Sequence, residues 1–202
     1  MSVNLVKGQK VELRKNGKGQ LRGVVVGLGW DEVEKSNSGG FLSGLFGSSR
    51  EDIDCDASAF LCQHGHLTSV DDVVYFGNLN HKSGCVRHMG DNLTGEGEGD
   101  DEQILVDLSK LPEIYDKIYI TVNIYRAKER KQHFGMIRNA FIRIFDAETG
   151  QELCRYNLSD NYDGKTAMVF GELYRHNGIW KFNAIGQATT DGDLGELAVR
   201  FQ

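Results

Sequence analysis

The chain has 202 residues, of which 40% are apolar and 26% charged, as expected for a single soluble globular domain spanning residues 1–202. Its formal net charge of −6 disfavours nucleic acid as a partner, because phosphates require a basic surface. The start of the chain does not resemble a signal peptide, and no stretch reaches the roughly 18 apolar residues of a transmembrane segment. We therefore expect a cytoplasmic protein.

Short alternating runs, 25 glycines and one proline predict an all-β protein with glycine turns. Turn signals recur about every ten residues, which favours a β-sandwich of two antiparallel sheets with short helical connections and long acidic loops at one end. Short helices are predicted at 109–112 and 126–134. The predicted strands are, in chain order, 11–13, 21–27, 53–61, 73–76, 103–108, 117–125, 139–145, 152–156, 167–174, 179–185 and 197–201.

Residues 35–50 interrupt this rhythm with a Gly/Ser-rich insertion that carries Phe41, Leu42, Leu45 and Phe46. One interpretation is a flexible surface loop whose apolar residues fold back on the sandwich. The other is an exposed apolar finger that meets a partner or a membrane.

The most informative stretch, residues 91–102, is acidic and rich in glycine and contains no basic residue. Its carboxylates repel one another strongly unless a cation lies among them. Hard oxygen donors on a loop suit Ca²⁺, although the spacing is not that of an EF-hand, and a merely solvated acidic loop is the alternative. The candidate ligands here are Asp91, Asn92, Glu96, Glu98, Asp100, Asp101 and Glu102.

Three further aspartates follow or begin predicted strands. Asp54 and Asp56 share one face of the strand at 53–61, and Asp31 follows the strand at 21–27. If these strand ends gather with residues 91–102, the carboxylates complete an acidic cup. Otherwise they are turn or edge residues. Acid–base catalysis is less suited to so crowded and hydrated a cluster, since it needs a carboxyl in an apolar pocket.

The four cysteines, at 55, 62, 85 and 154, lack C-x-x-C spacing and are expected to be reduced. A zinc site needs four closely arranged ligands. Packing and turn positions explain Cys62, His64 and His66 better than a zinc site does, and the same holds for Cys85 and His88.

Several blocks resemble the tellurium-resistance TerD family. They are Gly27-Leu-Gly-Trp-Asp31, Asp54-Cys-Asp-Ala-Ser-Ala-Phe60, the run from His88 to Glu102, Phe134-Gly-Met-Ile, Asn139-Ala-Phe-Ile-Arg143, the run from Gly171 to Phe182, and Ala184-Ile-Gly-Gln187. The similarity covers nearly the whole chain. With its glycine-rich insertion, the chain resembles the general-stress members found in spore-forming bacteria.

The resemblance implies a cytoplasmic calcium-binding β-sandwich that is associated with resistance to tellurite and other chemical stress and is not an enzyme. It implies two calcium ions near the acidic loops. Carried over by position, the ligand candidates are Asp31, Asp54, Asp56, Asp91, Asn92, Asp100, Asp101 and Glu102, with Glu96 and Glu98 as additional donors. The expected partners are other stress-resistance proteins of the same system, which could lie at the inner membrane surface.

Three functions compete at this point. The leading hypothesis is a calcium-dependent binding or scaffold module. The second is capture or reduction of tellurium oxyanions by the cysteines, although the net charge would repel such anions. The third is a plain calcium buffer.

Overall fold

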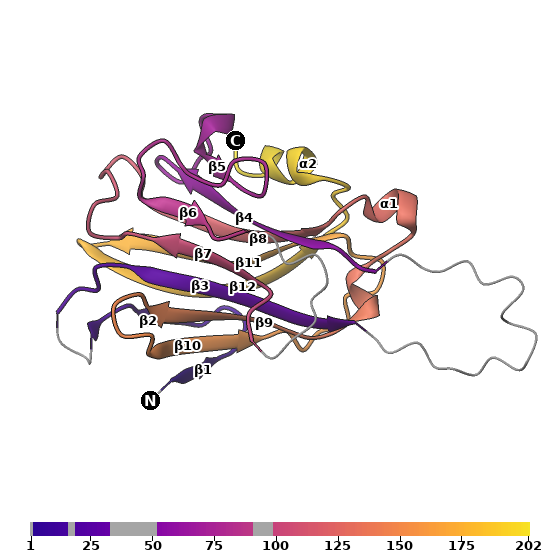
Figure 1. The fold of residues 1–202 in the computed structure, drawn as a ribbon, viewed down its shortest axis with the longest axis horizontal. Coiled ribbons are helices and arrows are strands. Elements are labelled where there is room, and N and C mark those ends of the chain that lie inside the picture. Colours follow the sequence, from indigo (N-terminus) through magenta and orange to yellow (C-terminus); the bar gives the residue numbers. More distant parts are fainter. Residues whose placement is uncertain (1, 16–18, 33–51, 91–98) are drawn as a thin grey trace, which may run out of the picture.

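The computed structural model describes residues 2–15, 19–32, 52–90 and 99–202. These residues form two six-stranded sheets packed face to face, so the predicted β-sandwich is confirmed (Figure 1). The insertion at 35–50 and most of the acidic stretch at 91–102 lie outside the described residues.

The first sheet has the strand order β1-β10-β9-β3-β7-β6. All neighbouring strands are antiparallel except β1, which pairs in parallel with β10. The sequence did not predict β1 or β6, whose three residues each carry only a weak alternation signal. The bounds are β1 Val3–Leu5, β3 Val24–Glu32, β6 Val86–His88, β7 Glu102–Val106, β9 Ile137–Asp146 and β10 Glu152–Asn157.

The second sheet has the order β2-β12-β11-β8-β4-β5 and is antiparallel throughout. Its strands lie at or near the predicted ranges, so the period-two pattern located them well. The bounds are β2 Lys10–Glu12, β4 Cys55–Cys62, β5 Val73–Val74, β8 Lys117–Ile124, β11 Ala167–His176 and β12 Ile179–Thr189.

The main hydrophobic core lies between the two sheets and is built from alternate residues of each strand. Val26 and Leu28 of β3 point into it, as do Ala57, Ala59 and Leu61 of β4. The intervening residues of β4 face the other way, as its alternation predicts. Phe60 therefore belongs to a second cluster, on the outer face of the second sheet.

The predicted strand at 197–201 is wrong, because this segment forms the end of helix α2 (Leu194–Val199) and the turn after it. The Asp193 side chain accepts a hydrogen bond from the Glu196 N–H and caps the helix N-terminus. Leu197 and Phe201 are four residues apart and pack together over the second sheet, where the Phe201 ring lies 5.2 Å from that of Phe60. Apolar residues at 197, 199 and 201 fit strand alternation, but only a helix buries 197 and 201 while leaving 199 exposed.

Two other short helical segments were predicted. Residues 126–134 contain helix α1 (Ala127–Arg130), and a 3₁₀ turn follows at Phe134–Met136, so helical structure is confirmed there. Residues 109–112 instead form a turn, in which Asp107 Oδ1 accepts hydrogen bonds from the N–H groups of Ser109 and Lys110. In the described part of the chain, no helix has the length and apolar character needed to cross a membrane.

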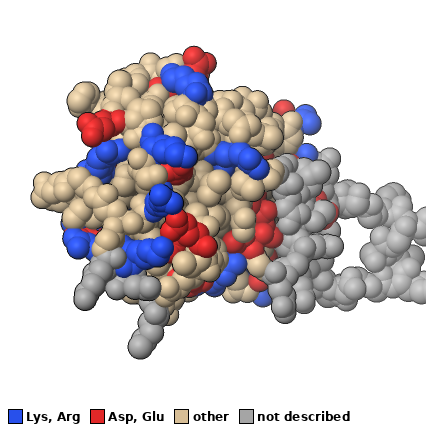
Figure 2. Space-filling model, turned by 60° about the vertical axis from the view of Figure 1, so that its left-hand side comes forward, with Lys and Arg blue, Asp and Glu red and all other residues tan. Residues whose placement is uncertain are grey.

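Charged side chains of both signs are interspersed over the face shown in Figure 2. Many of them pair, as Lys15 does with Glu148 at 2.9 Å. Such exposed pairs contribute little to stability, about 0–1 kcal/mol each. They give this face a mixed potential rather than a single-sign field.

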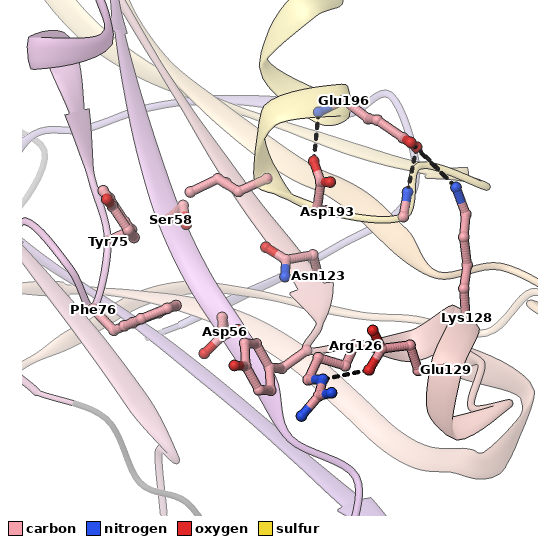
Figure 3. Close-up of a pocket in the computed structure, with 13 residues that line it drawn as sticks. Asp56, Ser58, Tyr75, Phe76, Asn123, Arg126, Lys128, Glu129, Asp193 and Glu196 are labelled. Carbon is pink, nitrogen blue, oxygen red and sulfur yellow. Dashed lines mark hydrogen bonds and ion pairs between the residues drawn. The ribbon is translucent and has the colours of Figure 1, made fainter.

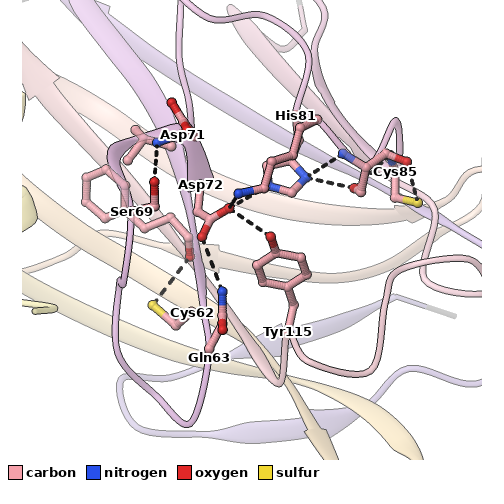
Figure 4. A network of polar contacts seen from close by, with 12 residues as sticks. Cys62, Gln63, Ser69, Asp71, Asp72, His81, Cys85 and Tyr115 are labelled. Atoms are coloured by element: carbon pink, nitrogen blue, oxygen red, sulfur yellow. Dashed lines mark hydrogen bonds and ion pairs between the residues drawn. The ribbon is translucent and has the colours of Figure 1, made fainter.

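A buried carboxylate, that of Asp72, holds together the loops at one margin of the second sheet (Figure 4). Its Oδ1 accepts hydrogen bonds from Tyr115 Oη at 2.8 Å and from His81 Nε2 at 3.1 Å, and it pairs with Lys82 Nζ at 2.8 Å. Burial alone would raise the pKa of Asp72, but the hydrogen bonds from Lys82, Tyr115 and His81 outweigh it and lower that pKa.

We expect Asp72→Asn to lower the free energy of unfolding at neutral pH by about 2–3 kcal/mol, since it removes charge-assisted hydrogen bonds. A carboxylate whose pKa is lowered by folding stabilises the protein above its unfolded pKa, about 3.9. That contribution is lost as the pH falls further, through the folded pKa. The difference between wild type and variant should therefore shrink in strongly acidic solution.

Denaturant unfolding at several pH values measures both effects. The matched control is Asp71→Asn, which removes the same charge from an exposed neighbour and should change stability little. A pH-independent difference between wild type and Asp72→Asn would contradict the assigned ionisation.

Candidate functional site

Strand pairing brings the predicted acidic residues to one end of the sandwich. β3 and β7 are antiparallel with Leu28 opposite Glu102, so the end of β3 lies beside the start of β7. The Glu102 carboxylate, in turn, accepts a hydrogen bond from the Ala57 N–H near the start of β4. Asp31, Asp56 and residues 100–102 therefore gather at the same end, although they point to different faces.

Asp101 lies against the end of β3. Its carboxylate Oδ2 accepts a hydrogen bond from the Trp30 N–H at 2.7 Å, and its own N–H donates to the Leu28 carbonyl at 2.7 Å. Burial raises the pKa of Asp101. The hydrogen bond from the Trp30 N–H lowers that pKa, whereas the nearby carboxylates of Asp31 and Asp100 raise it, and the net pKa is raised. Negative charge is thus crowded at this position.

Asp31 occupies the exposed end of β3 next to this crowded carboxylate. Its Oδ2 accepts a hydrogen bond from Asn139 Nδ2 of β9 at 2.7 Å. A register shift between Gly29 and Asp31 marks a bulge in the pairing of β3 with β9. Bulges re-aim side chains at strand ends, and here the bulge directly precedes Asp31.

The Asp100 carboxylate is held in place by contacts with two side chains. Its Oδ1 accepts from Arg143 Nε at 2.6 Å, and its Oδ2 accepts from Gln103 Nε2 at 2.9 Å. The carboxylate lies directly over Gly27, where an added Cβ would come within 2.3 Å of it. Both of its oxygens are therefore engaged, and Gly27 is needed for the close approach.

The remaining candidates lie around the start of β4. Glu102 is buried between the sheets, with His88 Nε2 3.7 Å from its carboxylate. Asp56 is also buried, but it lies on the outer face of the second sheet, opposite Asn123 of β8. Asp54 precedes the strand, and its carbonyl accepts a hydrogen bond from the Tyr125 N–H at 2.7 Å. Asp56 and Glu102 thus point away from each other.

Four of the predicted ligands, Asp91, Asn92, Glu96 and Glu98, lie outside the described residues. Among the residues that the structure does describe, no group of three or more His, Cys, Asp or Glu side chains is arranged to hold a metal ion. The donors that are present, Asp31 and Asp101, are hard carboxylate oxygens beside backbone carbonyls. This chemistry fits calcium rather than a soft metal.

The thiols lie in a different environment from these carboxylates. All four cysteines are buried, and none forms a disulfide with another. Burial raises the pKa of the Cys62 and Cys154 thiols to about 12. His64 lies in a turn with a positive φ of 52°, rather than on a strand face with Cys62. Within the described ranges, the Cys and His residues therefore pack the core and shape turns.

The sequence interpretation missed several residues that build this end. Arg143 holds Asp100, and its guanidinium also lies 4.6 Å from the Phe145 ring. Asn123 lies beside Asp56 in a pocket on the outer face of the second sheet (Figure 3). The alternation of β8 places Asn123 on the face opposite Val122 and Ile124, so a polar residue inside an apolar run was the available signal.

Comparison with known proteins agrees with this architecture. Residues 1–201 match the TerD domain family. The chain is 48% identical to stress response protein SCP2 of Bacillus subtilis (strain 168), over the full length of both chains. It is 43% identical to tellurium resistance protein TerD of Serratia marcescens, which it matches over 95% of this chain and 93% of the relative.

The fold is also found in solved structures. A crystal structure of a homologue of telluride resistance protein (TerD) from Streptomyces coelicolor A3(2) superposes with a TM-score of 0.64. The superposition covers 88% of this chain and 95% of that one, at 22% sequence identity. With the sequence matches, this shows that the chain belongs to the TerD family, whose members include proteins named for tellurium resistance and for the stress response.

Proposed function

We propose that this protein is a non-catalytic, calcium-dependent binding module of the stress response. The observation that carries the proposal is the gathering of the Asp31, Asp100 and Asp101 carboxylates at the end of β3, where burial and the two neighbouring carboxylates together raise the pKa of Asp101. Crowded carboxylates without enough positive charge favour a cation over a proton when the donors are hard oxygens on irregular backbone.

Within this proposal, Asp31 and Asp101 hold the ion, together with donors from the acidic stretch at 91–98. The Trp30 N–H fixes one oxygen of Asp101 at 2.7 Å, and Asp101 and Asp31 line the same hollow at this end of the sandwich. Asp100 has a supporting role, because Arg143 and Gln103 already engage both of its oxygens. Two calcium ions remain our expectation, with Asp54 and Glu102 as candidates for the second, because Asp56 points away from Glu102 to the outer face of the second sheet.

The bound ion would supply the positive charge that lets the acidic loops order against the sandwich. The ordered end would then recruit a protein partner in the cytoplasm, from the same stress-resistance system. The names of the relatives support this setting, since they include stress response, general stress and tellurium resistance proteins. A pull-down with calcium and with chelator separates such a module from a plain buffer, which would retain no partner in either condition.

Cysteine chemistry is the less favoured alternative. The thiolate is the reactive form of cysteine, and burial suppresses it. Raising the pKa of Cys62 from 9.0 to about 12 lowers its thiolate fraction at neutral pH about 1,000-fold. The four thiols are also spread over the core rather than gathered at a surface.

We expect titration calorimetry to show calcium binding with a Kd of about 10⁻⁷–10⁻⁵ M and much weaker magnesium binding, because Mg²⁺ demands rigid octahedral geometry. At calcium about 100 times above Kd, the free energy of unfolding should rise by about 2.7 kcal/mol per site. Absence of heat with calcium, or preferential binding of zinc, would overturn the proposal.

The variant Asp101→Asn should weaken calcium binding about tenfold or more, because the amide keeps the size of the side chain but removes its charge. Glu113→Gln is the matched control, since it removes one exposed carboxylate and should bind calcium as the wild type does. Equal affinities for Asp101→Asn and wild type would exclude Asp101 as a ligand.

We further expect the thiols of the native protein to react with Ellman's reagent far more slowly than those of the protein unfolded in guanidinium chloride. Burial of all four cysteines is the reason. Replacing Cys62 and Cys154 together with alanine should leave cellular tellurite resistance unchanged, provided that a melting curve shows the variant is folded. Fast labelling of the native protein, or loss of resistance in a folded variant, would favour the cysteine mechanism.

A further inference from the structure

A pocket of about 460 Å³ opens on the outer face of the second sheet, between β4, the loop after β5, and helices α1 and α2. This volume lies within the range of small-molecule sites, about 300–1,000 Å³. Figure 3 shows Asp56, Ser58 and Asn123 between an aromatic side, formed by Tyr75 and Phe76, and a charged side that includes Lys128 and Glu196. The proposed calcium function gives no role to this pocket.

The floor of the pocket carries buried acceptor atoms that have no partner. Ser58 Oγ and Asn123 Oδ1 are both buried and make no hydrogen bond within the described part of the chain. Ser58 is 0% exposed and Asn123 is 6% exposed. A buried polar atom without a partner destabilises the protein, so two of them in one pocket indicate a ligand that forms hydrogen bonds with them.

The walls are aromatic and unusually open to solvent. Phe76 is 47% exposed and Tyr125 is 40% exposed, and their rings meet edge to face with centroids 6.4 Å apart. Tyr75 extends this wall, with its ring 5.3 Å from that of Phe76. The guanidinium of Arg130 already lies 5.3 Å from the Tyr125 ring, which shows that this ring can accept a cation.

The charge of the lining is net negative. The two cationic residues that line the pocket are each held by a carboxylate, Arg126 by Glu129 and Lys128 by Glu196. Asp56 and Asp193 add two further carboxylates to the lining. Low-dielectric walls around a negative floor concentrate cations and repel anions.

We propose that this pocket binds a small organic cation: an amidinium, guanidinium or ammonium group on a flat apolar body. The N–H groups of the cation would donate to Asn123 Oδ1 and Ser58 Oγ, and Asp56 would supply the opposite charge. The apolar body would stack against Phe76 and Tyr125. A carboxylate anion has no N–H groups to donate and is repelled by the negative lining. A neutral amide can donate hydrogen bonds but has no positive charge to pair with Asp56.

Three molecules of nearly identical shape test this proposal: benzamidine, benzamide and benzoate. In a titration followed by two-dimensional amide NMR, benzamidine should shift signals of residues 56–58, 75–76, 123–126 and 193–196 saturably. Benzamide and benzoate should shift them little. The titrations are run with chelator and again with calcium, so that the result does not depend on whether calcium binds.

Phe76→Ala should weaken benzamidine binding about 2- to 10-fold, the fold-change expected for the loss of one aromatic stacking contact. Asn123→Leu removes the buried acceptor and should weaken benzamidine binding more than Phe76→Ala does. If Asn123→Leu does not fold, Phe76→Ala still tests the proposal. Ile114→Ala is the control, since Ile114 is 53% exposed and does not line the pocket. It should bind benzamidine as the wild type does.

Equal binding of the three probes, shifts scattered outside the pocket, or no binding of benzamidine would each overturn the proposal. Undiminished binding by Phe76→Ala and Asn123→Leu would do the same. The proposed calcium function stands or falls separately, because its test measures calcium affinity at Asp101.

Discussion

The acidic end of the molecule depends on one buried carboxylate, Glu102, that joins the two sheets. β5 pairs with β4 at Ala59 and Phe60, so within the described ranges no strand pairs with this edge of β4 at residues 55–58. Glu102 of β7 reaches across from the first sheet and accepts the Ala57 N–H. A buried charge is costly unless hydrogen bonded, so this contact constrains both strands strongly. It fixes the start of β7, and with it Asp100 and Asp101, relative to the start of β4.

This constraint separates two chemically different surfaces. On the first sheet, Gly27 has no side chain, so the Asp100 carboxylate can lie on the strand and bind Arg143, with Asp101 and Asp31 beside it. On the second sheet, Asp56 faces outward toward aromatic residues and Asn123. The first surface offers hard oxygens and suits a metal ion, whereas the second combines acceptors with rings and suits an organic cation. Both lie toward the end of the sandwich at which β4 and β7 begin.

Helix α2 completes the second surface and explains why β4 is buried on both faces. Leu197 and Phe201 cover Phe60, and this cluster insulates Cys62 from solvent. The same packing that forms one wall of the pocket therefore suppresses the reactivity of a thiol. Within the family, names that refer to tellurium thus need not imply direct chemistry between thiols and tellurium oxyanions.

Sequence alone determined the all-β class, most strand positions and the acidic residues at strand ends, because period-two alternation and turn residues are local signals. It did not determine β1 and β6, whose three residues carry too little pattern, nor α2, whose residues 197–201 fit either period. Only the tertiary structure decided which carboxylates meet. Gly27, Arg143 and Gln103 come to Asp100 from three strands, and Asn123 comes to Asp56 from a fourth. Such contacts depend on sheet order and register, which long-range packing sets and no local pattern of residues encodes.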